Sequence, residues 1–132
     1  MRPETLLDFM GVAEHLKCNM RHSRMTDHRR ESVAEHTYRL CVFAWLVKEE
    51  FPDCDMDKVM KMCLFHDLGE ALTGDIPAFV KTDDDRKTEG DALTLLTAML
   101  PGKERQELDE LFGELEREET MEAKIVHALD KM

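Results

Sequence analysis

The sequence lacks several features that would place it in a specialised class of protein. No apolar run approaches the roughly 20 residues that a membrane-spanning helix requires, so we expect no membrane partner. The first residues, MRPETLLDFMG, include Glu4 and Asp8 and form no long apolar core, which argues against a secretory signal peptide. The four cysteines show no CxxC spacing, which argues against a zinc knuckle or a redox pair. We therefore expect a cytoplasmic protein whose cysteines stay reduced.

An excess of positive charge is also missing, since 18 Lys and Arg face 29 Asp and Glu, for a formal net charge of -11. Residues 1–50 are balanced, so residues 51–132 carry the whole negative excess. Because duplex nucleic acid is bound by basic faces that neutralise phosphates, we do not expect it as a partner. Residues 17–30 are a local exception with a net charge of +4. This segment is either a solvated loop or a small phosphate-binding patch, because arginine suits phosphate oxygens.

Repeats, low-complexity linkers and alternating strand patterns are absent, whereas apolar residues recur at helical spacing. With 132 residues and 42% hydrophobic residues, the chain has the size and composition of a single globular domain, residues 1–132. We predict an all-α, single-domain orthogonal bundle of about six to seven helices. The expected helices cover residues 4–16, 33–51, 56–66, 83–100, 103–117 and 121–131, and a polar, basic loop covers residues 17–31.

Capping signals predict where three of these helices begin. Ser32 followed by Glu35 forms a capping box, and Asp55 and Thr120 are good N-cap residues. Glu35 either only completes this cap or also orients its neighbour His36. The helical pattern that contains Asp130 reaches the last residue without a stop signal, so we expect the domain to be truncated at its C-terminal end.

Four residues place metal-binding chemistry on apolar helical faces. His36 lies early in the second expected helix, His66 and Asp67 are adjacent at the end of the third, and Asp130 follows Val126 by one turn. A carboxylate on a core-facing stripe is costly unless it is paired or binds a metal. Two imidazoles and two carboxylates suit one divalent ion with open positions for water and substrate. Each residue alone also fits a satisfied core histidine or a surface aspartate, so the prediction depends on the joint pattern.

The order His36, His66-Asp67, Asp130 resembles the motif of the HD-domain metal-dependent phosphohydrolases. The surrounding segments RRESVAEHTYRL, MCLFHDLGEALTGDIPAF and EAKIVHALDKM resemble the 5′-deoxynucleotidase-like branch of that superfamily. The resemblance covers nearly the whole chain, and HDLGEALTGDIP is a long and specific match. It implies an HD-domain fold in which these four residues ligate one divalent ion, either Mn, Co, Zn, Fe or Mg.

The resemblance also implies roles for residues around the metal. Glu70 and Asp75 match acidic positions that face the water and the substrate, so they are the predicted catalytic acid–base groups. Glu70 could instead be a solvated helix-end carboxylate, and Asp75 could be an N-cap before Ile76-Pro77. Arg21, fifteen residues before His36, resembles the phosphate-binding arginine of the family. His22 occupies the sugar-contacting position, where the deoxynucleotidases carry an aromatic residue, and this departure leaves deoxyribose selectivity open.

These residues together predict a metal-dependent phosphoric monoester hydrolase of the 5′-nucleotidase type. Its substrates would be (deoxy)nucleoside 5′-monophosphates, from which it releases phosphate. One alternative is hydrolysis of another nucleotide, such as a nucleoside triphosphate or a guanosine tetraphosphate-like compound. Others are a regulatory domain that binds a nucleotide without turnover, and a helical interaction module without metal. We also expect a homodimer, because homodimers are the commonest soluble oligomers.

Overall fold

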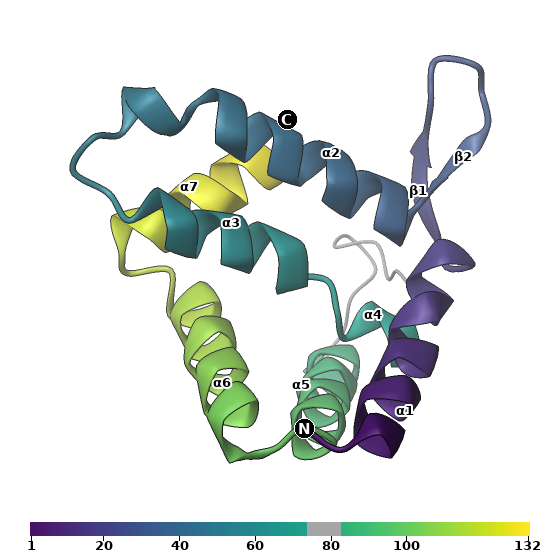
Figure 1. Cartoon of the computed structure of the whole chain (residues 1–132). Helices are drawn as coiled ribbons and strands as arrows, with labels where there is room; N and C mark the ends of the chain where they lie inside the picture. Colours follow the sequence, from purple (N-terminus) through teal and green to yellow (C-terminus); the bar gives the residue numbers. More distant parts are fainter. Residues whose placement is uncertain (74–82) are drawn as a thin grey trace.

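The computed structural model describes residues 1–73 and 83–132, except for the side chain of Arg86. Seven α-helices and one two-stranded hairpin make up this part of the chain (Figure 1). In chain order the elements are α1 (Pro3–Ala13), the 3-10 helix η1 (Glu14–Lys17), β1 (Met20–Arg24), β2 (Arg30–Ser32), α2 (Val33–Leu46), the 3-10 helix η2 (Lys48–Glu50), α3 (Met56–Phe65), α4 (Glu70–Thr73), α5 (Asp83–Ala98), α6 (Gly102–Arg117) and α7 (Met121–Asp130). The predicted all-α fold class is therefore confirmed.

The three predicted N-cap residues are found at the starts of α2, α3 and α7, the helices that contain or precede the predicted metal ligands. The Ser32 side chain accepts a hydrogen bond from the Glu35 N–H, and the Glu35 side chain accepts one from the Ser32 N–H, which completes the capping box of α2. Asp55 caps α3 by accepting from the Lys58 N–H, and Thr120 caps α7. These caps place the first turns of α2, α3 and α7 at fixed points of the chain.

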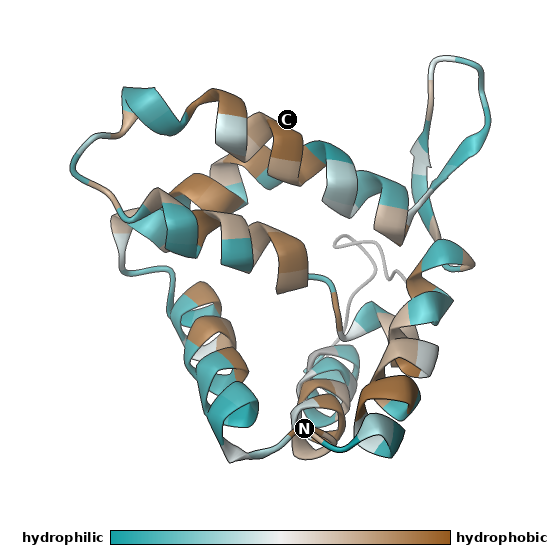
Figure 2. Cartoon of the chain, in the orientation of Figure 1, coloured by the Kyte–Doolittle hydropathy of each residue, from teal (hydrophilic) through white to brown (hydrophobic). Residues whose placement is uncertain are grey.

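The core lies where α2, α3 and α7 pack against one another, with α6 against α3 and α5 against α6. Figure 2 shows this division on α6, with apolar residues on its inner side and polar residues on its outer side. The largest fully buried side chains are Val33, Val59, Met62, Cys63, Leu96 and Val126. Because buried apolar area is the main favourable term in folding, this packing holds the three site-bearing helices together.

The hairpin corrects the prediction of a plain loop over residues 17–31. The two strands pair antiparallel with Met20 opposite Ser32, and His28 at the tip has a positive φ of 67°. Polar residues fill both faces of the strands, so no alternation of apolar and polar residues marked them in the sequence. Side chains reinforce the pairing instead, since Arg30 donates from Nε and Nη2 to the Arg21 carbonyl oxygen. The helix predicted over 4–16 also ends at Ala13 and continues as η1.

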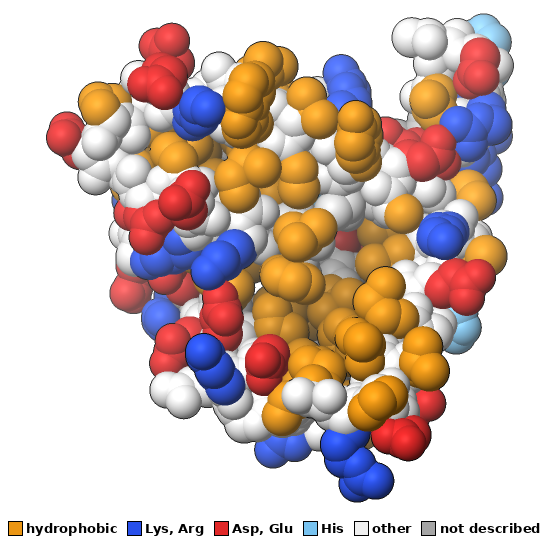
Figure 3. All heavy atoms as spheres, viewed as in Figure 1, with side chains coloured by type: hydrophobic (Ala, Val, Ile, Leu, Met, Phe, Trp, Pro, Cys, Tyr) orange, Lys and Arg blue, Asp and Glu red, His pale blue; other side chains and the backbone are white. Residues whose placement is uncertain are grey.

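The surface carries two kinds of patch. In Figure 3, apolar side chains gather in the middle of the viewed face over α1, α3 and α5, and Lys and Arg side chains gather on the hairpin. The more exposed large apolar residues include Leu7, Tyr38, Trp45, Leu46 and Leu95. Among the described residues, no helix combines the length and the apolar character needed to cross a membrane.

Candidate metal centre

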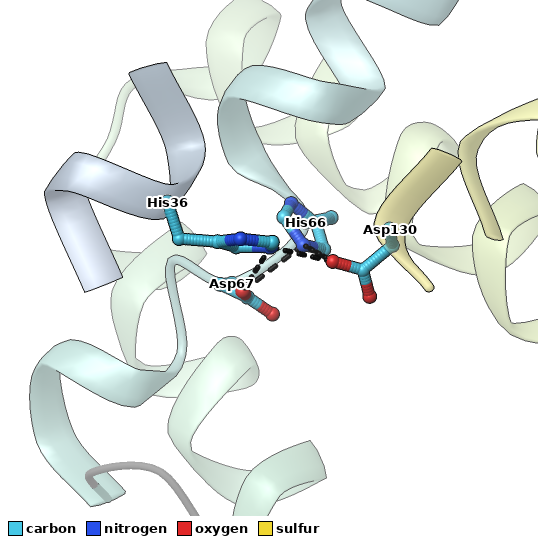
Figure 4. Close-up of side chains that lie close together, drawn as sticks. All are labelled: His36, His66, Asp67 and Asp130. Carbon is cyan, nitrogen blue, oxygen red and sulfur yellow. Dashed lines mark hydrogen bonds and ion pairs between the residues drawn. The ribbon is translucent and has the colours of Figure 1, made fainter. Parts of the chain in front are cut away.

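Four predicted ligands meet from three separate stretches of the chain. His36 lies in the first turn of α2, and Asp130 is the last residue of α7. His66 is the C-cap residue of α3, and Asp67 follows it in the turn that leads to α4. Because the chain leaves the helix at His66, these two neighbouring side chains reach the same point. Figure 4 shows all four side chains converging from α2, the end of α3 and α7.

The distances between the four side chains leave room for one ion. One ligand atom from each residue can be chosen so that all lie within 4.8 Å of one another. His36 Nε2 lies 2.6 Å from Asp130 Oδ1 and 4.0 Å from Asp67 Oδ2. His66 Nε2 lies 3.0 Å from Asp67 Oδ2 and 3.3 Å from Asp130 Oδ1. The two imidazoles are largely buried, with 11% and 10% of their side chains exposed, whereas the carboxylates are more open.

The electrostatics of the cluster follow from these contacts. Burial lowers the pKa of His66, but hydrogen bonds to Asp130 and Asp67 outweigh it and raise the pKa to about 10. Burial raises the pKa of Asp130, but hydrogen bonds from His36 and His66 outweigh it and hold the pKa well below its usual value. A cluster with two carboxylates attracts positive charge, which either a protonated imidazole or a bound cation can supply.

The donor set fits a divalent metal. His66 donates from Nδ1 to the Cys63 carbonyl oxygen at 2.9 Å, so its Nε2 faces the cluster as the coordinating nitrogen. Imidazole nitrogens with carboxylate oxygens suit several first-row divalent ions, so the donor set does not select one. Burial raises the pKa of the nearby Cys63 thiol to about 12, which keeps this thiol protonated and unreactive.

Known proteins are similar to this chain in sequence and fold. The family model that describes the HD domain matches residues 13–132. This chain belongs to the HD domain family. The human 5′-deoxynucleotidase HDDC2 is 36% identical over 105 residues, which cover 78% of this chain and 50% of that protein. The Xenopus laevis protein of the same name is 33% identical over 97% of this chain and 65% of its own length.

A solved structure agrees with the sequence comparisons. A structure described as a predicted metal-dependent phosphohydrolase from Magnetospirillum magnetotacticum superimposes with a TM-score of 0.88 at 30% identity. It covers 98% of this chain and 67% of the other chain. This HD domain thus spans about half the length of the first curated relatives and two thirds of this structural neighbour.

The predicted phosphate-binding arginine lies beside the metal ligands of this HD domain. Arg21 Nη1 donates to His36 Nδ1 at 2.6 Å and to Glu31 Oε1 at 2.8 Å. Arg21 is half-buried on β1, and the antiparallel pairing of β1 with β2 sets Glu31 next to it. His22, the next residue, is exposed and is not among the described residues that line a cavity with Arg21.

Of the two predicted catalytic carboxylates, the described part of the structure includes Glu70 but not Asp75. Glu70 begins α4 three residues after Asp67, and its Oε2 atom is buried rather than solvated. The Asn19 side chain donates to the Glu70 carbonyl oxygen at 2.6 Å and so fixes the start of α4 against the end of η1. Asp75 lies outside the described residues. The prediction of catalytic roles for both residues stays a prediction.

Two cavities adjoin the cluster, and their charges differ. The first, of about 740 Å³, is lined by Arg21, His36 and Asp130 together with three more cationic side chains, Arg24, Arg39 and Lys131. The second, of about 670 Å³, reaches His66, Asp67 and Asp130 from the side of α5 and α6. Its described lining contains no Lys or Arg and adds four acidic residues, Glu89, Asp109, Glu116 and Glu118. A negatively charged ligand is therefore favoured in the first cavity and repelled from the second.

Sequence reasoning missed Glu31 as a member of this neighbourhood. The residue lies five positions before His36, and a chain segment interpreted as a loop gave no reason to place it against Arg21. A hairpin prediction over residues 20–32 would have set the two side chains across from each other. Glu35, which the sequence left open between two roles, forms the α2 cap and pairs with Arg29. No contact between Glu35 and the His36 ring is found among the described residues.

Proposed function

We propose that this HD domain hydrolyses the phosphomonoester of nucleoside 5′-monophosphates. The observation that carries the proposal is the position of Arg21, a guanidinium in direct contact with one of four converging metal-ligand side chains. A guanidinium beside a divalent ion binds the oxygens of a phosphate dianion and offsets charge in the transition state. The relatives named 5′-deoxynucleotidase support the choice of nucleoside monophosphates among phosphate esters.

His36, His66, Asp67 and Asp130 would hold the divalent ion. Such an ion would act as a Lewis acid that polarises a phosphoryl oxygen, and it would lower the pKa of a bound water molecule toward neutral pH. Asp67 and Asp130 would offset its charge, and the two largely buried imidazoles would supply its nitrogen ligands. The native ion stays undetermined by this donor set, and Mn²⁺, Co²⁺, Zn²⁺, Fe²⁺ and Mg²⁺ remain candidates.

Arg21 and Glu70 would then both act on the substrate. Arg21 binds the phosphate from the side of the hairpin, in the cavity with the cationic lining. Glu70 begins α4, directly after the turn that holds Asp67, where a carboxylate can accept a proton from the attacking water or orient it. Asp75 is proposed as its partner at the leaving oxygen of the sugar, on the basis of the sequence match alone.

A turnover panel tests this proposal directly. Metal-reconstituted protein is incubated with ribo- and deoxyribonucleoside 5′-mono-, di- and triphosphates, and released phosphate is measured. We expect turnover of monophosphates, because a single Arg21 guanidinium beside the ligand cluster suits one terminal phosphate. Faster hydrolysis of triphosphates or of a guanosine tetraphosphate would favour the alternative prediction, a phosphohydrolase that acts on another nucleotide. Nucleotide binding without turnover of any compound would favour a regulatory domain.

The same panel addresses the sugar. Because His22 is exposed on β1 and replaces an aromatic residue at the sugar position, we propose weak discrimination between ribose and deoxyribose. The measurement is the ratio of kcat/KM for matched pairs, such as dAMP and AMP. A ratio above about 100 would contradict this expectation, since that selectivity corresponds to several kcal/mol of specific sugar contacts.

A further inference from the structure

Glu31 lies at the junction between the predicted phosphate-binding residue and the predicted metal ligands. Its Oε1 atom accepts from Arg21 Nη1 at 2.8 Å and lies 3.8 Å from His36 Nδ1. Only 14% of the Glu31 side chain is exposed, so its charge interacts with these two neighbours more strongly than a surface charge would. The carboxylate lies near the ring nitrogen of His36 that faces away from the ligand cluster, and a small shift would bring the two atoms within hydrogen-bond distance.

The hydrogen bonds of the His36 ring in the structure differ from those that a metal-bound imidazole would make. A guanidinium can only donate, so His36 Nδ1 accepts from Arg21, and the hydrogen of a neutral ring lies on Nε2, toward Asp130. If His36 coordinated a metal ion through Nε2, its neutral imidazole would carry its hydrogen on Nδ1. Two N–H groups cannot face each other at 2.6 Å. Arg21 would then not donate to Nδ1, and the Nδ1–H would need an acceptor.

We propose that Glu31 is a positioning residue that accepts the Nδ1–H of His36 when the cluster holds a metal ion. A carboxylate has two oxygens, so one oxygen can bind this N–H while the other keeps Arg21 beside the site. Arg21 would then no longer donate to His36, and its guanidinium would be available to a phosphate, a consequence that rests on the proposed function. Glu31 acts on the metal through His36, as carboxylates behind metal-bound histidines commonly do.

The chain offers a matched control for the charge of Glu31. Glu35 is also a glutamate close to His36 in sequence, but its oxygens bind the Ser32 N–H and the Arg29 guanidinium. Glu35→Gln removes one negative charge near the site and keeps an oxygen for the cap. Glu31→Gln removes one negative charge as well, but keeps an oxygen that can accept from Nδ1. Glu31→Ala removes both the charge and the acceptor.

The test is titration of metal-depleted protein with Co²⁺ or Zn²⁺, without substrate. We expect Glu31→Ala to weaken metal affinity by about 10-fold to 100-fold, the range seen when such partners are removed. Glu31→Gln should stay within about threefold of the wild type, and Glu35→Gln should bind as the wild type does, because hydrogen bonding rather than net charge acts. Equal losses in Glu31→Gln and Glu31→Ala, or full affinity in Glu31→Ala, would overturn the proposal.

A spectroscopic readout distinguishes positioning from a purely structural role. In Zn²⁺-loaded protein with ¹⁵N-labelled histidine, we expect a slowly exchanging Nδ1–H signal for His36 in the wild type and in Glu31→Gln. In Glu31→Ala this proton should exchange faster, and Glu31→Gln provides the comparison if the alanine variant does not fold. Slow exchange that persists in folded Glu31→Ala would show another acceptor. Because neither experiment uses a nucleotide, a failed turnover panel leaves this test unaffected.

Discussion

At the scale of single residues, Asp67 lies close to both imidazoles of the candidate metal centre. Its carboxylate lies 3.0 Å from His66 Nε2 and 4.0 Å from His36 Nε2, so it contributes charge next to both imidazoles. Asp67→Ala removes one of four ligand side chains, and we expect loss of metal retention and of turnover. Elemental analysis of purified protein and phosphate release provide the measurements. Asp57→Ala, an exposed position on α3, serves as the control, and a variant at Asp67 with full metal content and rate would show that the ligands are assigned wrongly.

A substitution of Arg21 should affect substrate binding without affecting metal binding. Its guanidinium contacts His36 but is a donor only, so it can bind an anion and not a cation. We expect Arg21→Ala to raise KM by about tenfold or more, since a hydrogen bond to a charged group is worth about 1.5 to 3 kcal/mol. Metal content should stay at the wild-type level. In the control variant Lys103→Ala, which removes an exposed cation on α6, KM and metal content should both stay at the wild-type level. Unchanged kcat/KM in Arg21→Ala would place the phosphate elsewhere.

At the scale of helices and strands, the sequence predicted the parts of the site that depend on helical spacing. The capping signals at Ser32, Asp55 and Thr120 predicted the starts of α2, α3 and α7. Of the four predicted ligands, α2 carries His36, α7 carries Asp130, and the end of α3 leads to His66 and Asp67. The hairpin escaped prediction because its stability comes from cross-strand pairing and arginine hydrogen bonds, which no period in the sequence reveals. The contact between Arg21 and Glu31 escaped with it, because it exists only across paired strands.

Thr120 shows how one residue positions a whole helix of the site. Its hydroxyl accepts from the Ala123 N–H at the start of α7 and donates to Glu114 Oε2 of α6 at 2.6 Å. We expect Thr120→Ala to lower the free energy of unfolding by about 1 to 2 kcal/mol, because both the cap and a hydrogen bond to a charged group are lost. Chemical denaturation measures this change. Thr120→Ser keeps the hydroxyl and should lose far less, and equal losses in the two variants would assign the effect to the methyl group instead.

At the scale of the whole molecule, the fold class followed from helical periodicity, whereas the meeting of distant residues depends on how the helices pack. His36 and Asp130 are 94 positions apart, and no local rule of helix or turn geometry brings such residues together. The sequence indicated the meeting through the joint pattern of ligand types on apolar faces and through the resemblance of that pattern to the HD-domain phosphohydrolases. The homodimer and the cytoplasmic location stay predictions, since neither depends on contacts within the described chain.

Metal binding should stabilise the entire fold, because the ligands join α2, the end of α3 and α7. An ion that binds the native state alone stabilises it by about 2.7 kcal/mol at 100 times its dissociation constant. For a chain of this length, that gain corresponds to a rise in melting temperature of roughly 10 °C. Calorimetry of metal-depleted protein with and without Mn²⁺ or Co²⁺ measures the shift. In Asp130→Ala the shift should disappear, since the ligand set is then incomplete. A shift of the same size in this variant would locate the ion away from the cluster.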